Sequence, residues 1–166
     1  MKIFKFGGAS VKDAESVKNV ASILSLYKKE QLIVVVSAMG KMTNALEKVV
    51  HAYYNQDPGL KTYIDEIRNF HFKIVDDLGF PENHPLRHDL ENCFVEIDWA
   101  CEEPPSRGYG FSYDQIVSQG ELMSTKIISA YLMNSDIANA WLDVRDVLQT
   151  DNTYREAKVN WELTEQ

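Results

Sequence analysis

Cysteine is scarce in this chain of 166 residues, which contains only Cys93 and Cys101. They lie eight residues apart within one helical pattern, so we interpret them as buried thiols and not as a disulfide or a metal-binding pair. Four histidines are scattered along the chain, at His51, His71, His84 and His88. None has cysteines or paired carboxylates at ligand spacing, so we expect no metal site and place these histidines at the surface or at helix ends.

Basic residues and long apolar runs are also lacking. Seventeen lysines and arginines stand against 25 acidic residues, and the net charge of -8 disfavours nucleic acid and anionic membrane surfaces as partners. The one adjacent basic pair, Lys28-Lys29, we place in the last turn of a helix. No run approaches the roughly 20 apolar residues of a membrane span, and Met1-Lys2 leads directly into a strand pattern without a secretory segment. These absences predict a cytoplasmic globular protein.

The N-terminus contains the pattern of a strand, a glycine turn and a helix. The apolar run Ile3–Phe6 includes Lys5 and is followed at once by Gly7–Ser10. Ser10, with Asp13 three residues later, has the spacing of a variant capping box. Bare glycine amides and a helix N-terminus favour an anion, usually phosphate, which the ammonium of Lys5 can also reach. In the alternative interpretation the glycines only form a tight connection, and Lys5 is an edge cation that extends into solvent.

A second strand is predicted at Leu32–Val36, where a continuous β-branched run is typical of a parallel strand covered on both faces. Ligands of such sheets bind beyond the carboxyl ends of the strands. The N-terminal glycines and Ser37–Gly40 both follow such ends, so we expect the two loops to lie side by side over one pocket. The alternative for residues 37–43 is a plain loop before a helix that Asn44 caps and Glu47 supports.

Residues 44–134 have a mainly helical pattern. The last of these helices is expected to begin at Ser112, which has Gln115 at capping-box spacing. Gly120 costs about 1 kcal/mol relative to alanine in mid-helix, so we expect something to pack closely against it. Its neighbour Glu121 can meet the ammonium of a small substrate, or it can be an ordinary solvated carboxylate on a helix.

Two more strands are predicted after the helices. Residues 137–142 are apolar enough for a third strand, and polar residues at 143–146 follow its carboxyl end. Residues 157–161 alternate in the manner of a fourth strand. Together with the two N-terminal strands, they predict an α/β protein with a mainly parallel sheet.

Three stretches carry a resemblance to a known family. They are Lys5–Gly8, Val34–Leu46 and Val117–Thr125, in this order and at these distances. As a set they closely resemble the N-terminal half of the aspartate kinases, within the amino acid kinase superfamily. The resemblance covers nearly the whole chain and departs at Ala9, where many members carry threonine.

The resemblance implies a three-layer α/β/α fold with a mainly parallel sheet, incomplete here and with a large helical section in the middle. Residues 1–166 would form the N-terminal part of one amino acid kinase catalytic domain. Family members continue through a nucleotide-binding C-terminal part and ACT regulatory domains, which are absent from this sequence. We therefore expect a fragment that is weak or inactive alone, with an open sheet edge and bare apolar faces that favour a homo-oligomer.

The resemblance also implies the reaction. Aspartate kinases transfer the γ-phosphoryl group of ATP to the side-chain carboxylate of L-aspartate, the first step towards lysine, threonine and methionine. By the family pattern Lys5 is the catalytic residue that bridges the phosphates, and Gly7, Gly8 and Ser10 line the phosphate loop. Mg²⁺ is implied as an ion carried by the nucleotide, with no metal site on the protein.

The acceptor site follows from the other two stretches. By the same pattern Ser37, Ala38 and Thr43 hold the aspartate, and Glu121 engages its amino group.

Two other functions stay open. The chain could belong to a superfamily member that acts on glutamate, acetylglutamate, carbamate or a nucleoside monophosphate. It could also be a non-catalytic remnant that serves as an interaction module, although a retained Lys5 beside intact glycines argues against this.

Overall fold

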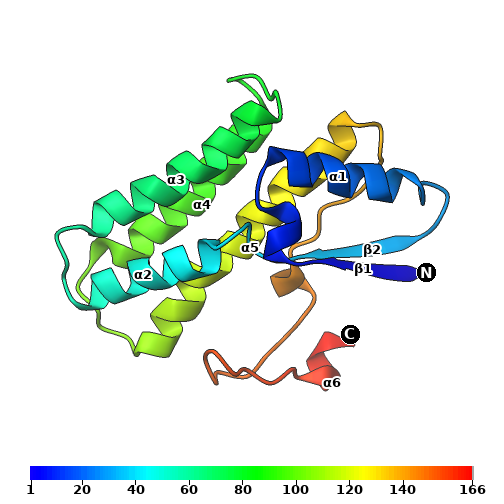
Figure 1. The fold of residues 1–166 in the computed structure, drawn as a ribbon. Helices are drawn as coiled ribbons and strands as arrows, with labels where there is room; N and C mark the ends of the chain where they lie inside the picture. The colour runs from blue at the N-terminus through cyan, green and yellow to red at the C-terminus, as the bar shows by residue number, and fades with distance from the viewer. Residues whose placement is uncertain (166) are drawn as a thin grey trace.

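The structure is a computed structural model that describes residues 1–165 (Figure 1). It is an α/β fold, as the sequence predicts, and its described residues contain one parallel pair of strands. The elements in chain order are β1 (Lys2–Phe6), η1 (Gly8–Val11), α1 (Ala14–Ser25), β2 (Leu32–Val36), α2 (Met42–Tyr54), α3 (Leu60–Asp77), α4 (Pro85–Glu102), α5 (Tyr109–Asn134), η2 (Val144–Asp146) and α6 (Trp161–Thr164). Within residues 1–165, no helix combines the length and apolar character needed to cross a membrane.

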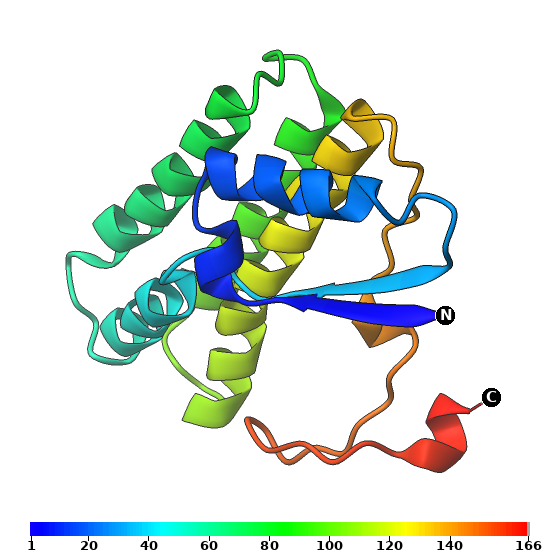
Figure 2. The ribbon, with the colours of Figure 1, turned by 45° about the vertical axis from the view of Figure 1, so that its right-hand side comes forward.

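The strands β1 and β2 pair in parallel, from Lys2 opposite Leu32 to Phe6 opposite Val36. Helix α1 lies along one face of this pair of strands, and α5 contacts both α1 and β2 (Figure 2). Every second side chain, ending with Phe6 and Val36, points into the core.

The other face of the sheet is uncovered. Ile3, Ile33 and Val35 are 68%, 44% and 45% exposed. The prediction that β2 is covered on both faces is therefore wrong within this chain, because the described helices cover only one side.

Helix α1 begins later than expected. Asp13, and not Ser10, is its N-cap, and the Asp13 carboxylate accepts a hydrogen bond of 2.8 Å from the Ser16 amide. Ser10 lies in the short helix η1, whose first turn is closed by the Ser10 amide donating to the Gly7 carbonyl at 2.8 Å. The basic pair Lys28-Lys29 lies in the turns after α1 and not in its last turn.

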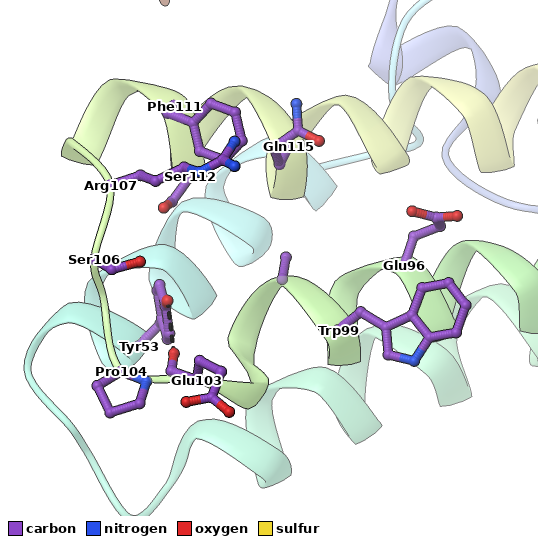
Figure 3. Close-up of a pocket in the computed structure, with 11 residues that line it drawn as sticks. Tyr53, Glu96, Trp99, Glu103, Pro104, Ser106, Arg107, Phe111, Ser112 and Gln115 are labelled. Carbon is purple, nitrogen blue, oxygen red and sulfur yellow. Dashed lines mark hydrogen bonds between the residues drawn. The ribbon is translucent and has the colours of Figure 1, made fainter.

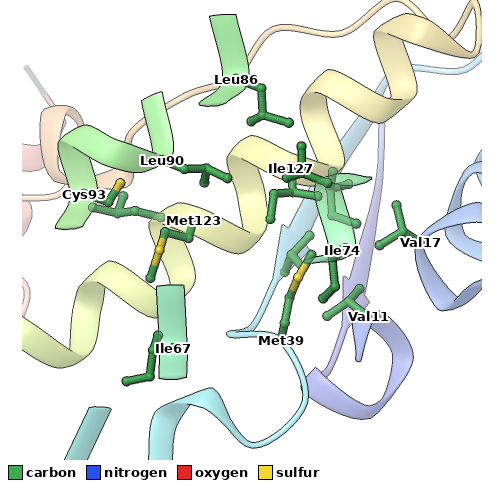
Figure 4. Packing of buried hydrophobic residues seen from close by; sticks show 14 of the residues in the cluster. Val11, Val17, Met39, Ile67, Ile74, Leu86, Leu90, Cys93, Met123 and Ile127 are labelled. Atoms are coloured by element: carbon green, nitrogen blue, oxygen red, sulfur yellow. The ribbon is translucent and has the colours of Figure 1, made fainter. Parts of the chain in front are cut away.

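The helical section of the prediction is confirmed. The long helix α5 packs against both α4 and α2, and its buried residues Met123 and Ile127 face Leu90 and Leu86 of α4 (Figure 4). Cys93, a free thiol, is buried in the same layer, as predicted. Burial of these apolar side chains is the main source of stability in this half of the chain.

Two predicted helix starts are wrong. Helix α2 begins at Met42 after Lys41, so Asn44 lies inside it and does not cap it. Helix α5 begins at Tyr109, and Ser112 lies one turn inside, buried at 3.3 Å from the Tyr54 hydroxyl. In both cases tertiary packing against a neighbouring helix extends the element beyond its local capping signal.

The predicted third and fourth strands are also wrong. Residues 137–142 form no strand in the described chain, and the Asn139 amide instead ties this segment to α5 by donating to the Ser129 carbonyl at 3.2 Å. Residues 157–161 contribute one isolated antiparallel bridge, between Thr150 and Val159. A strand requires a partner with free backbone groups, and neither segment is paired with the described β1–β2 sheet.

Candidate active site

The loops that follow the two strands are joined by their main chains, as predicted. The Ser37 amide donates to the Phe6 carbonyl at 3.0 Å, and the Gly40 amide donates to the Gly8 carbonyl at 2.9 Å. The strand pairing thus continues beyond the strands into the loops. We call the two segments, residues 7–11 and 37–40, the strand-end junction.

Gly8 is required for this close approach. A Cβ atom on Gly8 would lie 2.7 Å from the Ala38 carbonyl oxygen and 2.8 Å from that of Gly40, closer than real Cβ contacts. Gly40 itself has a φ of +53°, a conformation that glycine adopts without strain. Gly7, by contrast, has extended backbone, and a Cβ atom there would have no other atom within 4 Å. Gly8 therefore allows the two loops to pack closely, whereas the backbone of Gly7 is accessible to a ligand.

The helix N-terminus expected beside the glycines is displaced from them. Because α1 begins at Ala14, its first-turn amide at Ser16 is already satisfied by Asp13. This carboxylate also occupies the positive end of the helix dipole, and the hydrogen bond from Ser16 lowers the pKa of Asp13. An anion at the junction would therefore meet the open backbone of the glycine loop and not the end of α1.

Lys5 lies opposite Val35 in the sheet, one residue before both strands end. Its side chain is exposed, on the same face as Ile33 and Val35. The lysines that form ion pairs in the described chain are Lys2, Lys18 and Lys73. Lys5 has no such partner within residues 1–165, so its ammonium is available to an external anion.

Helix α5 brings Glu121 to the second loop. The Ala38 amide donates to Glu121 Oε1 at a long 3.4 Å, and the half-buried carboxylate keeps its second oxygen free of any protein partner within the described chain. Gly120 permits the approach, because a Cβ there would lie 3.1 Å from Ala38 Cβ and 2.8 Å from Leu46 Cδ1. The close packing predicted at Gly120 is confirmed.

Ser124, one turn further along α5, is a residue to which sequence reasoning gave no role. It is fully buried, and its hydroxyl donates to the Ser37 carbonyl at 2.8 Å. The spacing of four residues from Gly120 was the available signal, because it places both on one helix face. Thr43 lies near by in the first turn of α2, half-buried, just after Gly40.

The structure thus brings part of the predicted site together at the ends of the two strands. Gly8, Ser37, Ala38 and Glu121 are linked by direct contacts, while Lys5 lies at the adjoining strand end. Among residues 1–165 no three histidine, cysteine or acidic side chains lie close enough to hold a metal ion. What the arrangement offers is an ammonium, open backbone amides and one carboxylate, which together suit a small zwitterionic acceptor and a polyphosphate.

A cavity of about 300 Å³ lies elsewhere, at the other end of α5. Figure 3 shows it between the end of α4 and the start of α5, with Trp99, Arg107 and Phe111 around it. The Tyr53 hydroxyl donates to the Glu103 carbonyl at 2.9 Å on its floor. Its described lining includes none of the predicted site residues, so the candidate site is an open surface at the strand ends and not this cavity.

The strongly shifted titratable groups also lie away from the junction. Burial lowers the pKa of His71 from 6.5 to about 4, although a hydrogen bond to the Ile67 carbonyl opposes the shift. Burial raises the pKa of both Cys93 and Cys101 to about 11. These groups are uncharged at neutral pH. His71 and Cys93 lie in the core, whereas Cys101, predicted to be buried, is only partly buried beside it. The prediction that the histidines lie at the surface or at helix ends is wrong for His71, which is 0% exposed within α3.

Comparison with known proteins assigns the family. Residues 1–165 match the amino acid kinase family, and the chain belongs to it. Among curated proteins it is 31% identical over 157 residues to lysine-sensitive aspartokinase 3 of Escherichia coli, covering 94% of this chain and 34% of that protein. It is 33% identical over 136 residues to the chloroplastic aspartokinase 2 of Arabidopsis thaliana, covering 78% of this chain and 24% of that protein.

Solved structures agree with this family. The crystal structure of E. coli aspartokinase III in complex with aspartate and ADP superposes with a TM-score of 0.84 at 30% identity, over 99% of this chain and 36% of that one. The complex of the same enzyme with lysine and aspartate gives a TM-score of 0.85. The resemblance inferred from the three stretches is confirmed, and the chain spans between about a quarter and about a third of the length of these relatives.

Proposed function

We propose that the chain forms part of an aspartate kinase, which transfers the γ-phosphoryl group of ATP to the side-chain carboxylate of L-aspartate and yields 4-phospho-L-aspartate. The observation that carries the proposal is the meeting of the glycine loop, the Ser37-Ala38 loop and Glu121 at one strand end. Similarity to the E. coli aspartokinase solved with aspartate and ADP supports the choice of both substrates.

In this reaction a carboxylate oxygen of aspartate attacks the γ-phosphorus, and the bond to the β–γ bridging oxygen breaks to release ADP. The acceptor carboxylate is already ionised at pH 7, so no general base is required. Catalysis depends on position and on charge neutralisation at the transferring oxygens. Lys5 supplies that positive charge, and the backbone of Gly7 and Gly8, with Ser10, lines the phosphates.

The acceptor is held from the other side of the junction. Ser37, Ala38 and Thr43 contact the aspartate, and the free carboxylate oxygen of Glu121 binds its ammonium group. ATP would bring Mg²⁺ with it, as an ion carried by the nucleotide. When bound with ATP, the ion would supply further positive charge for the phosphates, in addition to that of Lys5.

We further propose that residues 1–166 are the N-terminal part of one catalytic domain, with the nucleotide-binding remainder and the ACT regulatory domains in a longer polypeptide. Coverage of only 34% of the E. coli relative supports this. The isolated 166 residues are then expected to be weak or inactive. Formation of 4-phosphoaspartate by this segment alone, detected as its hydroxamate, contradicts the proposal. The cytoplasmic location expected from the sequence stays a prediction.

Self-association is proposed for the isolated chain, because the uncovered face of the sheet exposes Ile3, Ile33 and Val35. We expect a dimer or a larger form at tens of micromolar. Sedimentation velocity checks this, and a Val35→Lys variant should shift the population towards monomer. A wild-type chain that sediments as a clean monomer contradicts it.

The protein expressed from its complete coding sequence tests the reaction. Phosphoryl transfer from ATP is compared for L-aspartate, L-glutamate, N-acetyl-L-glutamate, carbamate and a nucleoside monophosphate. We expect transfer to L-aspartate, and its loss by at least about 100-fold in Lys5→Ala, within the range for removal of one preorganised charge-stabilising group. Lys29→Ala, in the turn after α1, is the matched control and should keep full activity.

The same assay decides between the alternatives. Preference for glutamate, acetylglutamate, carbamate or a nucleotide acceptor assigns another member of the superfamily. Absence of transfer to any acceptor, together with no thermal protection by ATP or ADP, indicates a non-catalytic remnant.

A further inference from the structure

One peptide unit of the junction is held at both of its polar ends by α5. The carbonyl of Ser37 accepts a hydrogen bond from the Ser124 hydroxyl at 2.8 Å, and the amide of Ala38 donates to Glu121 Oε1 at 3.4 Å. The carbonyl and the amide belong to the same planar peptide group, so they cannot turn independently. The two side chains of α5 together fix the rotation of this plane.

The two contacts are unequal. The bond from Ser124 has ideal length and a fully buried donor residue, whereas the bond to Glu121 is long and its carboxylate is half-buried. A carbonyl that loses its protein donor favours an orientation in which it finds another partner. The orientation of the Ser37-Ala38 peptide therefore depends mainly on Ser124, and the contact of Glu121 with Ala38 follows from it.

Other hydroxyls of the same helix do not reach the junction. Ser118 donates at 3.5 Å to the Gln115 carbonyl of its own helix. Thr125 donates to carbonyls of its own helix at 2.9 and 3.0 Å and accepts a bond from the Trp141 indole. Among these three residues, Ser124 alone connects α5 to the loop that follows β2.

We propose that Ser124 is a positioning residue for the acceptor substrate, acting through the Ser37-Ala38 peptide on Ser37 and Glu121. This inference rests on the proposed function, because it takes the acceptor site to lie at that peptide. Ser124 is fully buried beneath the loop, so its effect is transmitted through Ser37 and Glu121. Its loss should weaken binding of the acceptor amino acid more than binding of the nucleotide, whose proposed contacts are on the glycine loop.

The test uses the protein expressed from its complete coding sequence, with variants Ser124→Ala, Ser124→Cys and Ser118→Ala. We expect Ser124→Ala to raise the KM for L-aspartate about tenfold, the effect of losing one hydrogen bond, and to leave the KM for ATP within about twofold. Ser124→Cys keeps nearly the same volume and a weak donor, so its KM should fall between those of wild type and Ser124→Ala. Ser118→Ala, the matched control, should behave as wild type.

Three outcomes overturn the inference. An unchanged KM for L-aspartate in Ser124→Ala shows that the peptide keeps its position without the hydroxyl. An equal rise in both KM values shows general loosening of the fold. If Ser124→Ala does not fold, Ser124→Cys replaces it in the test. An unchanged ratio of the KM for L-aspartate to the KM for ATP in Ser124→Cys then overturns the inference.

A second measurement separates this inference from the proposed function. If the wild type phosphorylates no aspartate, the proposed function fails, and the position of the peptide is then read from hydrogen exchange of the Ala38 amide. We expect this amide to exchange at least about tenfold faster in Ser124→Ala than in Ser118→Ala, because its partner Glu121 is lost when the peptide turns. Equal rates in the two variants overturn the inference without any reference to activity.

Discussion

The strand-end junction and the pair of helices α3 and α4 are built on different physical principles. At the junction small residues bring two backbones into contact, with Gly8 against the carbonyls of Ala38 and Gly40. The α3–α4 pair is held by large apolar side chains, among them Phe94 and Ile67 at 0% and 2% exposure. A single methyl group should thus disturb the junction, whereas the helices should tolerate changes that conserve volume.

The polar groups differ in the same way. At the junction they make hydrogen bonds between segments, such as the one from Ser124 to Ser37. Between α3 and α4 the buried polar group is His71, whose Nε2 has no hydrogen-bond partner in the described part of the chain. One region uses its polar groups to hold a loop in place, and the other tolerates an unsatisfied group inside an apolar core.

The largest effect on stability is expected at Phe94. Its ring is fully buried, with the His71 ring at 6.2 Å and the Arg68 guanidinium at 4.5 Å from its centroid. We expect Phe94→Ala to lower the free energy of unfolding by about 4 kcal/mol, through lost burial and the cavity left behind. Urea denaturation measures this, and Val95→Ala, at an exposed neighbouring position, should change it by less than about 0.5 kcal/mol. A loss below about 1 kcal/mol in Phe94→Ala would contradict the contrast between the two regions.

His71 gives the α3–α4 pair a dependence on pH. Burial lowers the pKa of His71 in the folded chain to about 4, against 6.5 for an ordinary histidine. Between these values the unfolded state binds more protons, so stability is complete above about pH 6.5 and falls as the pH is lowered towards 4. We expect His71 to account for a loss of about 3 kcal/mol across this window.

Urea denaturation at pH 7 and pH 4.5 measures that loss. A His71→Leu variant should lose less stability over the same interval than wild type, and His88→Gln, at an exposed position, should lose as much as wild type. Equal pH dependence in wild type and His71→Leu would show that carboxylates alone carry it.

The smallest of the three expected changes in stability is at the junction, for Gly8→Ala. This substitution should affect activity more than stability. Gly8→Ala puts a methyl group 2.7 and 2.8 Å from two backbone oxygens, so the loops must separate. We expect a loss of about 2 kcal/mol in stability and about 100-fold in the proposed phosphoryl transfer. Gly7→Ala is the matched control for stability, because its φ of -76° suits any residue and a Cβ atom there would have no atom within 4 Å. If both variants lose the same stability, the close approach at Gly8 is not the determinant.

Much of the helical section could be predicted, because its apolar residues recur with helical spacing. The burial of His71 was also within reach, since it lies four residues after Ile67 and three before Ile74 on the apolar face of α3. Two strands were predicted wrongly because a strand depends on a partner elsewhere in the chain, and local alternation cannot report whether that partner is present. At α1, Ser10 and Asp13 are both good capping residues, so the sequence offered no reason to choose between them.

By itself the sequence determined which residues end the two strands and that glycines stand there, because these properties depend on neighbours within a few positions. That was sufficient to predict the phosphate loop, and together with the stretch Val117–Thr125 it predicted the likeness to aspartate kinases. Only the tertiary structure decided that α5 would place Gly120, Glu121 and Ser124 against the peptide between Ser37 and Ala38. The physical reason is that these contacts join positions more than 80 residues apart, and their geometry comes from how a whole helix packs and not from any local preference.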